Sequence, residues 1–217
     1  GREAGALDGS FGFTGSTADR AVLADADLII SSNAALETEH LVLAVDVMGA
    51  VRRGARLIVV SSAPGPGEGA LSALVMDPMK GQSGVLWNGI LRLLTEDGTL
   101  PADRVSGLPE LLAVGRGPSF ETESVARQTG VDGSDIRRAA EMVKEARRIV
   151  CIHGMDRLRD RAPGDLEALA NLVLLLRARG ARADLLLPRL IGNTAGLEVA
   201  GADPAFAAGR RPADPLP

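Results

Sequence analysis

Ser32 and Asn33 are the residues in this sequence whose types and position most clearly suggest chemistry. They follow residues 27–31, which read as a buried strand, and a helix is expected to begin near Glu37. Hydroxyl and amide side chains, together with the unpaired N–H groups at the start of a helix, can hold a phosphate without any basic residue. This stretch therefore predicts an anion-binding turn between a strand and a helix.

A second strand follows within thirty residues. Residues 38–53 carry apolar residues at helical spacing, and residues 56–60 (RLIVV) read as another buried strand. A strand, a helix and a second strand form a βαβ unit, and nucleotides bind at the carboxyl ends of such strands. Residues 61–69 are too rich in Pro and Gly to continue either periodic structure, so they are predicted to form a surface loop at that edge.

The rest of the chain continues to alternate strands with helices. Further strands are predicted at residues 75–76, 149–153 and 185–187. Helices are predicted at residues 17–24, 85–96, 108–114, 121–128, 134–144 and 165–179, with Thr17 and Ser134 as N-caps. This alternation predicts an α/β fold, in which a Rossmann-like parallel sheet has helices on both faces. We expect residues 17–205 to form this domain, with a connecting segment at 1–16 and a C-terminal linker at 206–217.

Composition excludes several classes of function. The 217 residues carry a net charge of −4 and only 2% aromatic residues, with no Tyr, which argues against a nucleic-acid partner. No apolar run approaches the roughly 18 residues of a membrane span, and no export signal is recognisable, so direct membrane insertion is not expected and the cytoplasm is the expected compartment. Membrane association through a complex stays open.

The few Cys and His residues bear on metal and redox chemistry. A single cysteine, Cys151, excludes an internal disulfide, and with only His40 and His153 beside it a self-contained metal site is not expected. Cys151 lies within a predicted strand and is expected in the core. His40 either contacts a phosphate or is an exposed or capping histidine. His153 follows a predicted strand, where side chains often face a ligand, and that role stays open.

Seven short blocks follow one another in a recognisable order. They are residues 24–33 (ADADLIISSN), 50–60 (AVRRGARLIVV), 80–83 (KGQS), 86–91 (LWNGIL), 129–131 (TGV), 168–172 (ALANL) and 193–196 (NTAG). As an ordered set they resemble the Rossmann-like middle domain of the molybdopterin oxidoreductase family. That family includes formate dehydrogenase alpha subunits, nitrate reductases and the large iron-sulfur subunit of NADH-quinone oxidoreductase. Its counterparts of the first four blocks are a strand and loop ending in GSN, then AVRRGAKLIVV, PGTD and LLNGLL.

The resemblance implies a cofactor and a set of binding residues. In the family this domain holds the guanosine diphosphate end of a molybdopterin guanine dinucleotide. Carried over by position, Ser32 and Asn33 would lie near the diphosphate and Ser61 near a ribose or phosphate. The residues near the guanine would be Gly81, Gln82 and Ser83. The catalytic and cluster-binding residues of the family have no counterpart here, so the chain is expected to hold no metal and to catalyse nothing by itself.

The resemblance leaves two functions open. In the first, the chain is part of a formate dehydrogenase-like subunit, and its partners are the remaining domains of the same polypeptide and other redox subunits. In the second, it is a cofactor-free structural domain of the NADH-quinone oxidoreductase large subunit. Ser83 in place of the Asp of PGTD favours the second, because a hydroxyl accepts hydrogen bonds from guanine more weakly than a carboxylate does. A free-standing nucleotide-binding module, like the central domain of thiamine-diphosphate enzymes, would not explain the blocks at 86–91 and 193–196.

Overall fold

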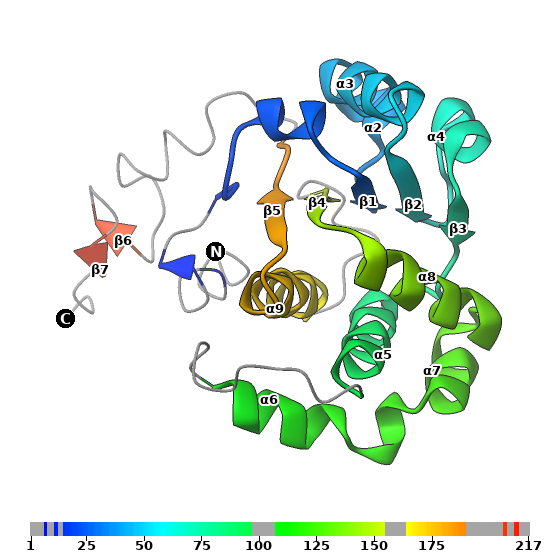
Figure 1. Cartoon of the computed structure of the whole chain (residues 1–217), viewed down its shortest axis with the longest axis vertical. Coiled ribbons are helices and arrows are strands. Elements are labelled where there is room, and N and C mark those ends of the chain that lie inside the picture. The colour runs from blue at the N-terminus through cyan, green and yellow to red at the C-terminus, as the bar shows by residue number, and fades with distance from the viewer. Residues whose placement is uncertain are drawn as a thin grey trace.

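A five-stranded parallel sheet forms the centre of the chain (Figure 1). The computed structural model describes residues 15–96, 107–154 and 164–189, together with Leu7, Phe11, Gly12, 206–207 and 211–212. The strand order is β3-β2-β1-β4-β5. The strands are Leu28–Ser32 (β1), Arg56–Val60 (β2), Leu74–Met76 (β3), Arg148–His153 (β4) and Arg182–Leu186 (β5). The predicted α/β fold with a parallel Rossmann-like sheet is confirmed.

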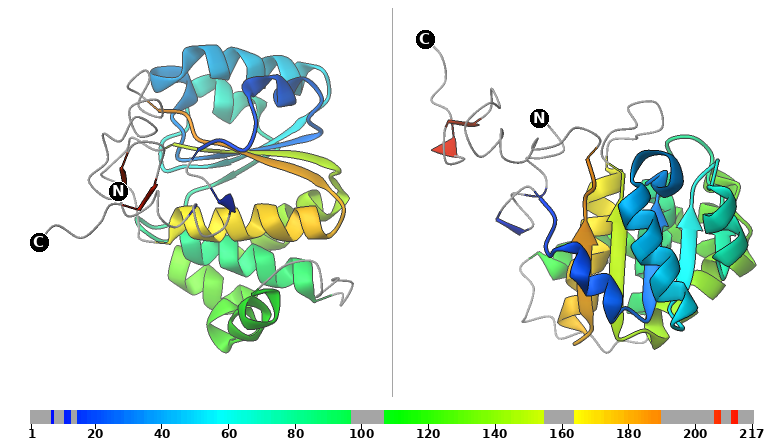
Figure 2. Two further views of the ribbon diagram at one scale, coloured as in Figure 1. Left: turned by 90° about the vertical axis from the view of Figure 1, so that its left-hand side faces the viewer. Right: turned by 90° about the horizontal axis from the view of Figure 1, so that it is seen from above.

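Helices cover both faces of this sheet (Figure 2). One face packs against α5 (Ser83–Thr95), α8 (Gly133–Glu145) and α9 (Asp165–Ala178). The other packs against the short 3-10 helix η1 (Arg20–Ala24), α2 (Leu36–Glu39) and α3 (Leu41–Arg52). The remaining helices are α4 (Pro66–Leu71), α6 (Leu108–Gly115), η2 (Pro118–Phe120) and α7 (Thr122–Thr129).

The strands read as continuous apolar runs because each face of the sheet is buried. All five residues of β1 are buried, and successive side chains point to opposite faces. Leu28 and Ile30 join the core beneath α5 and α9, whereas Ile29 joins the core beneath α3. The central strand is therefore held by two hydrophobic cores.

Two predictions on the segments that follow the first two strands were wrong. Residues 61–69 were expected to form only a loop, but Pro66–Leu71 is helix α4. Pro66 tolerates the first helical turn because no N–H is needed there. A contact distant in sequence supports this helix, since Glu37 Oε1 accepts the Glu68 N–H at 2.6 Å. The helix expected at 38–53 is interrupted at His40, where α2 ends and α3 begins.

Both predicted N-caps were also wrong. The residue that caps η1 is Asp19, not Thr17, and Thr17 Oγ1 instead donates to Asp184 Oδ1 at 2.9 Å. The residue that caps α8 is Asp132, whose carboxylate accepts the N–H of Ser134 at 2.7 Å. In each case an aspartate competes successfully for the role, because a carboxylate accepts a backbone N–H more strongly than a hydroxyl does.

The predicted terminal segments are only partly described. Phe206–Ala207 (β6) pairs antiparallel with Arg211–Pro212 (β7), inside the segment predicted to be a linker. Residues 190–205, including the NTAG block, lie outside the described residues. Among the helices that the structure describes, none is long and apolar enough to cross a membrane.

Candidate functional site

The carboxyl edge of the sheet brings the ends of three strands together. Ser32, Val60 and His153 are register partners at this edge, because β1, β2 and β4 run parallel. The Asn33 N–H donates to the Val60 carbonyl at 2.9 Å, and the Gly154 N–H donates to the Ser32 carbonyl at 3.1 Å. The turn after β1 is thus fixed to both neighbouring strands.

Asn33 connects this turn to the start of α5. Its φ of 49° lies in the left-handed region, which Asn adopts more readily than most residues. Its Nδ2 donates to Ser83 Oγ at 3.4 Å. Two residues fifty positions apart therefore meet at the carboxyl edge of the sheet.

A polar pocket of about 360 Å³ opens beside this hydrogen bond. It lies between the turn after β1, the segment from β3 to α5 and the end of α7. Its lining residues are Asn33, Ser62, Asp77, Pro78, Met79, Lys80, Gly81, Ser83, Thr129 and Gly130. The volume is within the range of small-molecule sites, which run from about 300 to 1,000 Å³.

Three of the six predicted binding residues line this pocket, namely Asn33, Gly81 and Ser83. Gly81 has a φ of 78° in the turn that leads into α5. Gln82 is the N-cap residue of α5, where its N–H donates to the Met79 carbonyl at 2.9 Å. Gln82 is not among the residues that line the pocket.

The two other predicted serines lie at the edge but outside the pocket lining. Ser32 is fully buried, and its Oγ lies 3.4 Å from His153 Nδ1. Ser61 is buried as well, and its Oγ accepts the Ala63 N–H at 3.2 Å. Their hydroxyls are thus engaged by the chain itself.

The charged residues of the pocket were not among those predicted from the sequence. Asp77 and Lys80 both line it and both are exposed. Asp77 directly follows β3 and Ser62 lies two residues beyond β2, so the rule that ligands meet the carboxyl ends of parallel strands could have indicated them. Thr129 and Gly130 could not have been found in that way, because they come from the end of a helix. A contact places them, since the Met79 N–H donates to the Thr129 carbonyl at 2.7 Å.

A carboxylate of the chain itself already binds the N-terminus of α5. The Gly84 N–H donates to Asp165 Oδ1 at 2.7 Å, and Asp165 is buried at the first turn of α9. A negative charge is favoured at a helix N-terminus because of the helix dipole and its unpaired N–H groups. One first-turn amide of α5 is therefore already used, and hydrogen bonding in the pocket falls mainly to its side chains.

The chemistry that the pocket offers is recognition. It combines a carboxylate, which accepts hydrogen bonds, with an ammonium group, which pairs with anions. An amide and several hydroxyls add groups that both donate and accept hydrogen bonds. Among the described residues, no group of three or more His, Cys, Asp or Glu residues could hold a metal ion. Cys151 is buried in β4, and burial raises the pKa of its thiol to about 12, which suits a core residue rather than a nucleophile.

The strand order and the polar pocket at the carboxyl edge define the chain as a Rossmann-like α/β domain. No protein-family model matches the sequence, and no curated protein matches it. Among solved structures, it is similar to acetylene hydratase from Pelobacter acetylenicus, with a TM-score of 0.62 and 18% sequence identity. The match covers 83% of this chain and 24% of that chain, so this chain spans about a quarter of the length of acetylene hydratase. At this identity the similarity establishes the fold.

Proposed function

We propose that this chain is a domain of a molybdopterin-dependent oxidoreductase of formate dehydrogenase type. In this proposal, the pocket holds the guanosine diphosphate end of a molybdopterin guanine dinucleotide. The structural neighbour supports the enzyme class, because acetylene hydratase is a molybdopterin enzyme. The ordered sequence blocks support the same class independently.

The observation that carries the proposal is the meeting of Asn33 and Ser83 in one pocket with Asp77 and Lys80. The resemblance assigned Asn33 to the diphosphate and Ser83 to the guanine, and the two residues come from segments fifty positions apart. Their hydrogen bond joins the two halves of the proposed nucleotide site. The residues present also suit the group, because they supply a cation for phosphate and an acceptor for a base.

Asp77 supplies what the sequence lacks at position 83. Guanine presents a ring N–H and an amino group side by side, and a carboxylate accepts hydrogen bonds from both. The family has an Asp where this chain has Ser83. Asp77 lines the same pocket as Ser83 from the other end of the same turn, and we assign it the guanine edge.

The role of the chain in the whole enzyme is to bind and orient. When bound, the cofactor supplies the redox chemistry, and the protein supplies its position and surroundings. Lys80 pairs with the diphosphate, while Asn33 and Ser83 fix the turn that separates diphosphate from base. The remaining domains of the polypeptide and other redox subunits are the proposed partners, in the cytoplasm or at a membrane through a complex.

A cofactor-free structural domain of the NADH-quinone oxidoreductase type is the second candidate. Three contacts favour it specifically. Asp165 already occupies one first-turn amide of α5, and the hydroxyls of Ser32 and Ser61 are engaged within the chain. A domain with these contacts keeps its fold but offers fewer hydrogen-bond donors to a phosphate.

Calorimetric titration of the chain with GDP and ADP separates the two candidates. The cofactor-holding function predicts that GDP binds more tightly than ADP and that Lys80→Ala weakens GDP binding several-fold. Lys144→Ala is the matched control, because Lys144 lies at the far end of α8 and lines a different hollow. Absence of GDP binding at millimolar concentration would favour the cofactor-free domain.

A further inference from the structure

The outer face of α3 exposes an unusual amount of apolar surface. Leu41, Val42 and Val45 are 67%, 65% and 61% exposed, and all three lie near the start of α3. Their buried neighbours on the same helix, Ala44 and Val47, are 1% exposed. A helix that is apolar on its outer face as well as its inner one is typical of a helix with a further partner.

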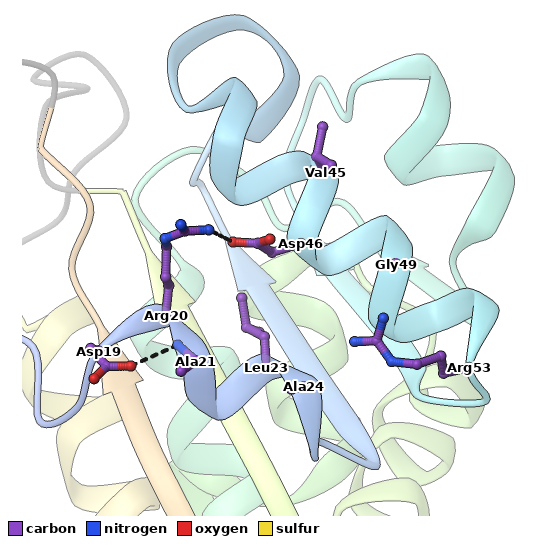
Figure 3. Close-up of a pocket in the computed structure, with 9 residues that line it drawn as sticks. All are labelled: Asp19, Arg20, Ala21, Leu23, Ala24, Val45, Asp46, Gly49 and Arg53. Carbon is purple, nitrogen blue, oxygen red and sulfur yellow. Dashed lines mark hydrogen bonds and ion pairs between the residues drawn. The ribbon is translucent and has the colours of Figure 1, made fainter.

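A groove runs beside this face, between η1 and α3 (Figure 3). Its volume is about 590 Å³, and its wall on the α3 side includes Val45 and Gly49. Leu23 contributes from η1, and the ion pair between Arg20 and Asp46, with an N···O distance of 2.5 Å, joins the two walls. The exposed side chain of Val45 is therefore continuous with an apolar groove.

The charges at the two ends of this face have opposite signs. Glu39 precedes α3, and Arg52 and Arg53 end it. A surface that is acidic at one end, apolar in the middle and basic at the other is complementary to itself when it is turned by 180°. We propose that this face binds a second copy of the chain, with the two α3 helices packed antiparallel across a two-fold axis.

This arrangement places particular residues of the two copies opposite one another. With the axis beside Val45, Val42 of one copy lies opposite Gly49 of the other, and Glu39 lies opposite Arg52. Gly49 offers the space for a side chain, since its own position lacks one and only the Arg53 guanidinium lies over it, with Nη1 3.3 Å from where a Cβ would be. The helix is about 18 Å long at 1.5 Å per residue, so the interface is small and the dimer is weak, with a Kd on the order of micromolar.

Analytical ultracentrifugation over a range of concentrations tests the apolar part of the surface. The mass is expected to rise from 22.5 kDa toward twice that value as the concentration increases. Val45→Glu is expected to raise the Kd at least about tenfold, because it places two like charges at the axis. Val75→Glu is the matched control, since Val75 is also an exposed valine but lies on β3. A chain that stays monomeric at all concentrations, or equal effects of the two variants, would overturn the proposal.

Charge reversal tests the orientation of the two copies. Arg52→Glu alone and Glu39→Arg alone are each expected to weaken self-association, because each sets like charges opposite one another twice. An equimolar mixture of the two variants is expected to associate again, since each new charge then faces its opposite. Circular dichroism of each variant verifies that the fold is intact. If the mixture associates no better than the separate variants, the antiparallel pairing is wrong.

Discussion

The backbone of Gly154 lies in direct contact with the backbone of Asn33. A Cβ added to Gly154 would overlap the Asn33 carbonyl oxygen and would lie 2.9 Å from Ala34 Cα. The Gly154 N–H also donates to the Ser32 carbonyl at 3.1 Å. The end of β4 thus packs against the turn after β1, and this contact sets the position of Asn33 in the candidate site.

Substitution of Gly154 by Ala is expected to destabilise the chain by at least about 2 kcal/mol, because backbone atoms on both sides must move to admit the methyl group. Gly69→Ala is the control, since a Cβ there meets nothing within 4 Å and Gly69 lies inside helix α4. That variant is expected to be neutral or slightly stabilising. Urea unfolding measures both, and similar losses would contradict the contact.

Asp77 is expected to decide between guanine and adenine nucleotides. Asp77→Asn should lower the preference for GDP over ADP several-fold, because the amide presents one acceptor where the carboxylate presents two. Ser83→Ala should change the preference less. Calorimetric titration with the two nucleotides measures it. A variant that binds GDP and ADP in the same ratio as the unaltered chain would show that Asp77 does not contact the base.

The cap of α8 should depend on Asp132 rather than Ser134. Hydrogen bonds from the Ser134 hydroxyl and N–H lower the pKa of the Asp132 carboxyl below its usual value of 3.8. A lowered pKa in the folded state contributes stability at neutral pH that is lost as the pH falls through that pKa. Asp132→Ala should therefore lower the Tm more than Ser134→Ala does at pH 7. The difference in Tm between Asp132→Ala and the unaltered chain should shrink as the pH falls through this pKa. Thermal unfolding at several pH values measures this difference.

The thiol of Cys151 should be unreactive in the folded chain. Burial, with a smaller contribution from Asp184, raises its pKa from 9.0 to about 12. Between these values only the unfolded thiol ionises, so the free energy of unfolding falls as the pH rises above about 9. We expect no reaction with a thiol reagent at pH 8 until urea unfolds the chain. Cys151→Ala should lose less stability between pH 8 and pH 10 than the unaltered chain, and rapid labelling without urea would contradict the burial.

Much of the fold could be predicted from the sequence because its signals are local. The apolar runs at 56–60 and 149–153 and the periodic helices between strands gave the parallel sheet, since a strand buried on both faces must be apolar throughout. Helix α4 was missed because its stability depends partly on Glu37, which lies thirty-one residues away from Glu68. Local Pro and Gly content alone indicated a loop.

The sequence by itself determined the class of fold and the edge of the sheet at which Ser32 and Asn33 lie, because strand direction and alternation follow from residue order. Only the tertiary structure decided which side chains share a pocket. It placed Asn33 beside Ser83 and Asp77, and it buried Ser32 against His153. Such choices depend on how separate loops pack over the ends of the strands, and packing between segments distant in sequence leaves no local pattern to read.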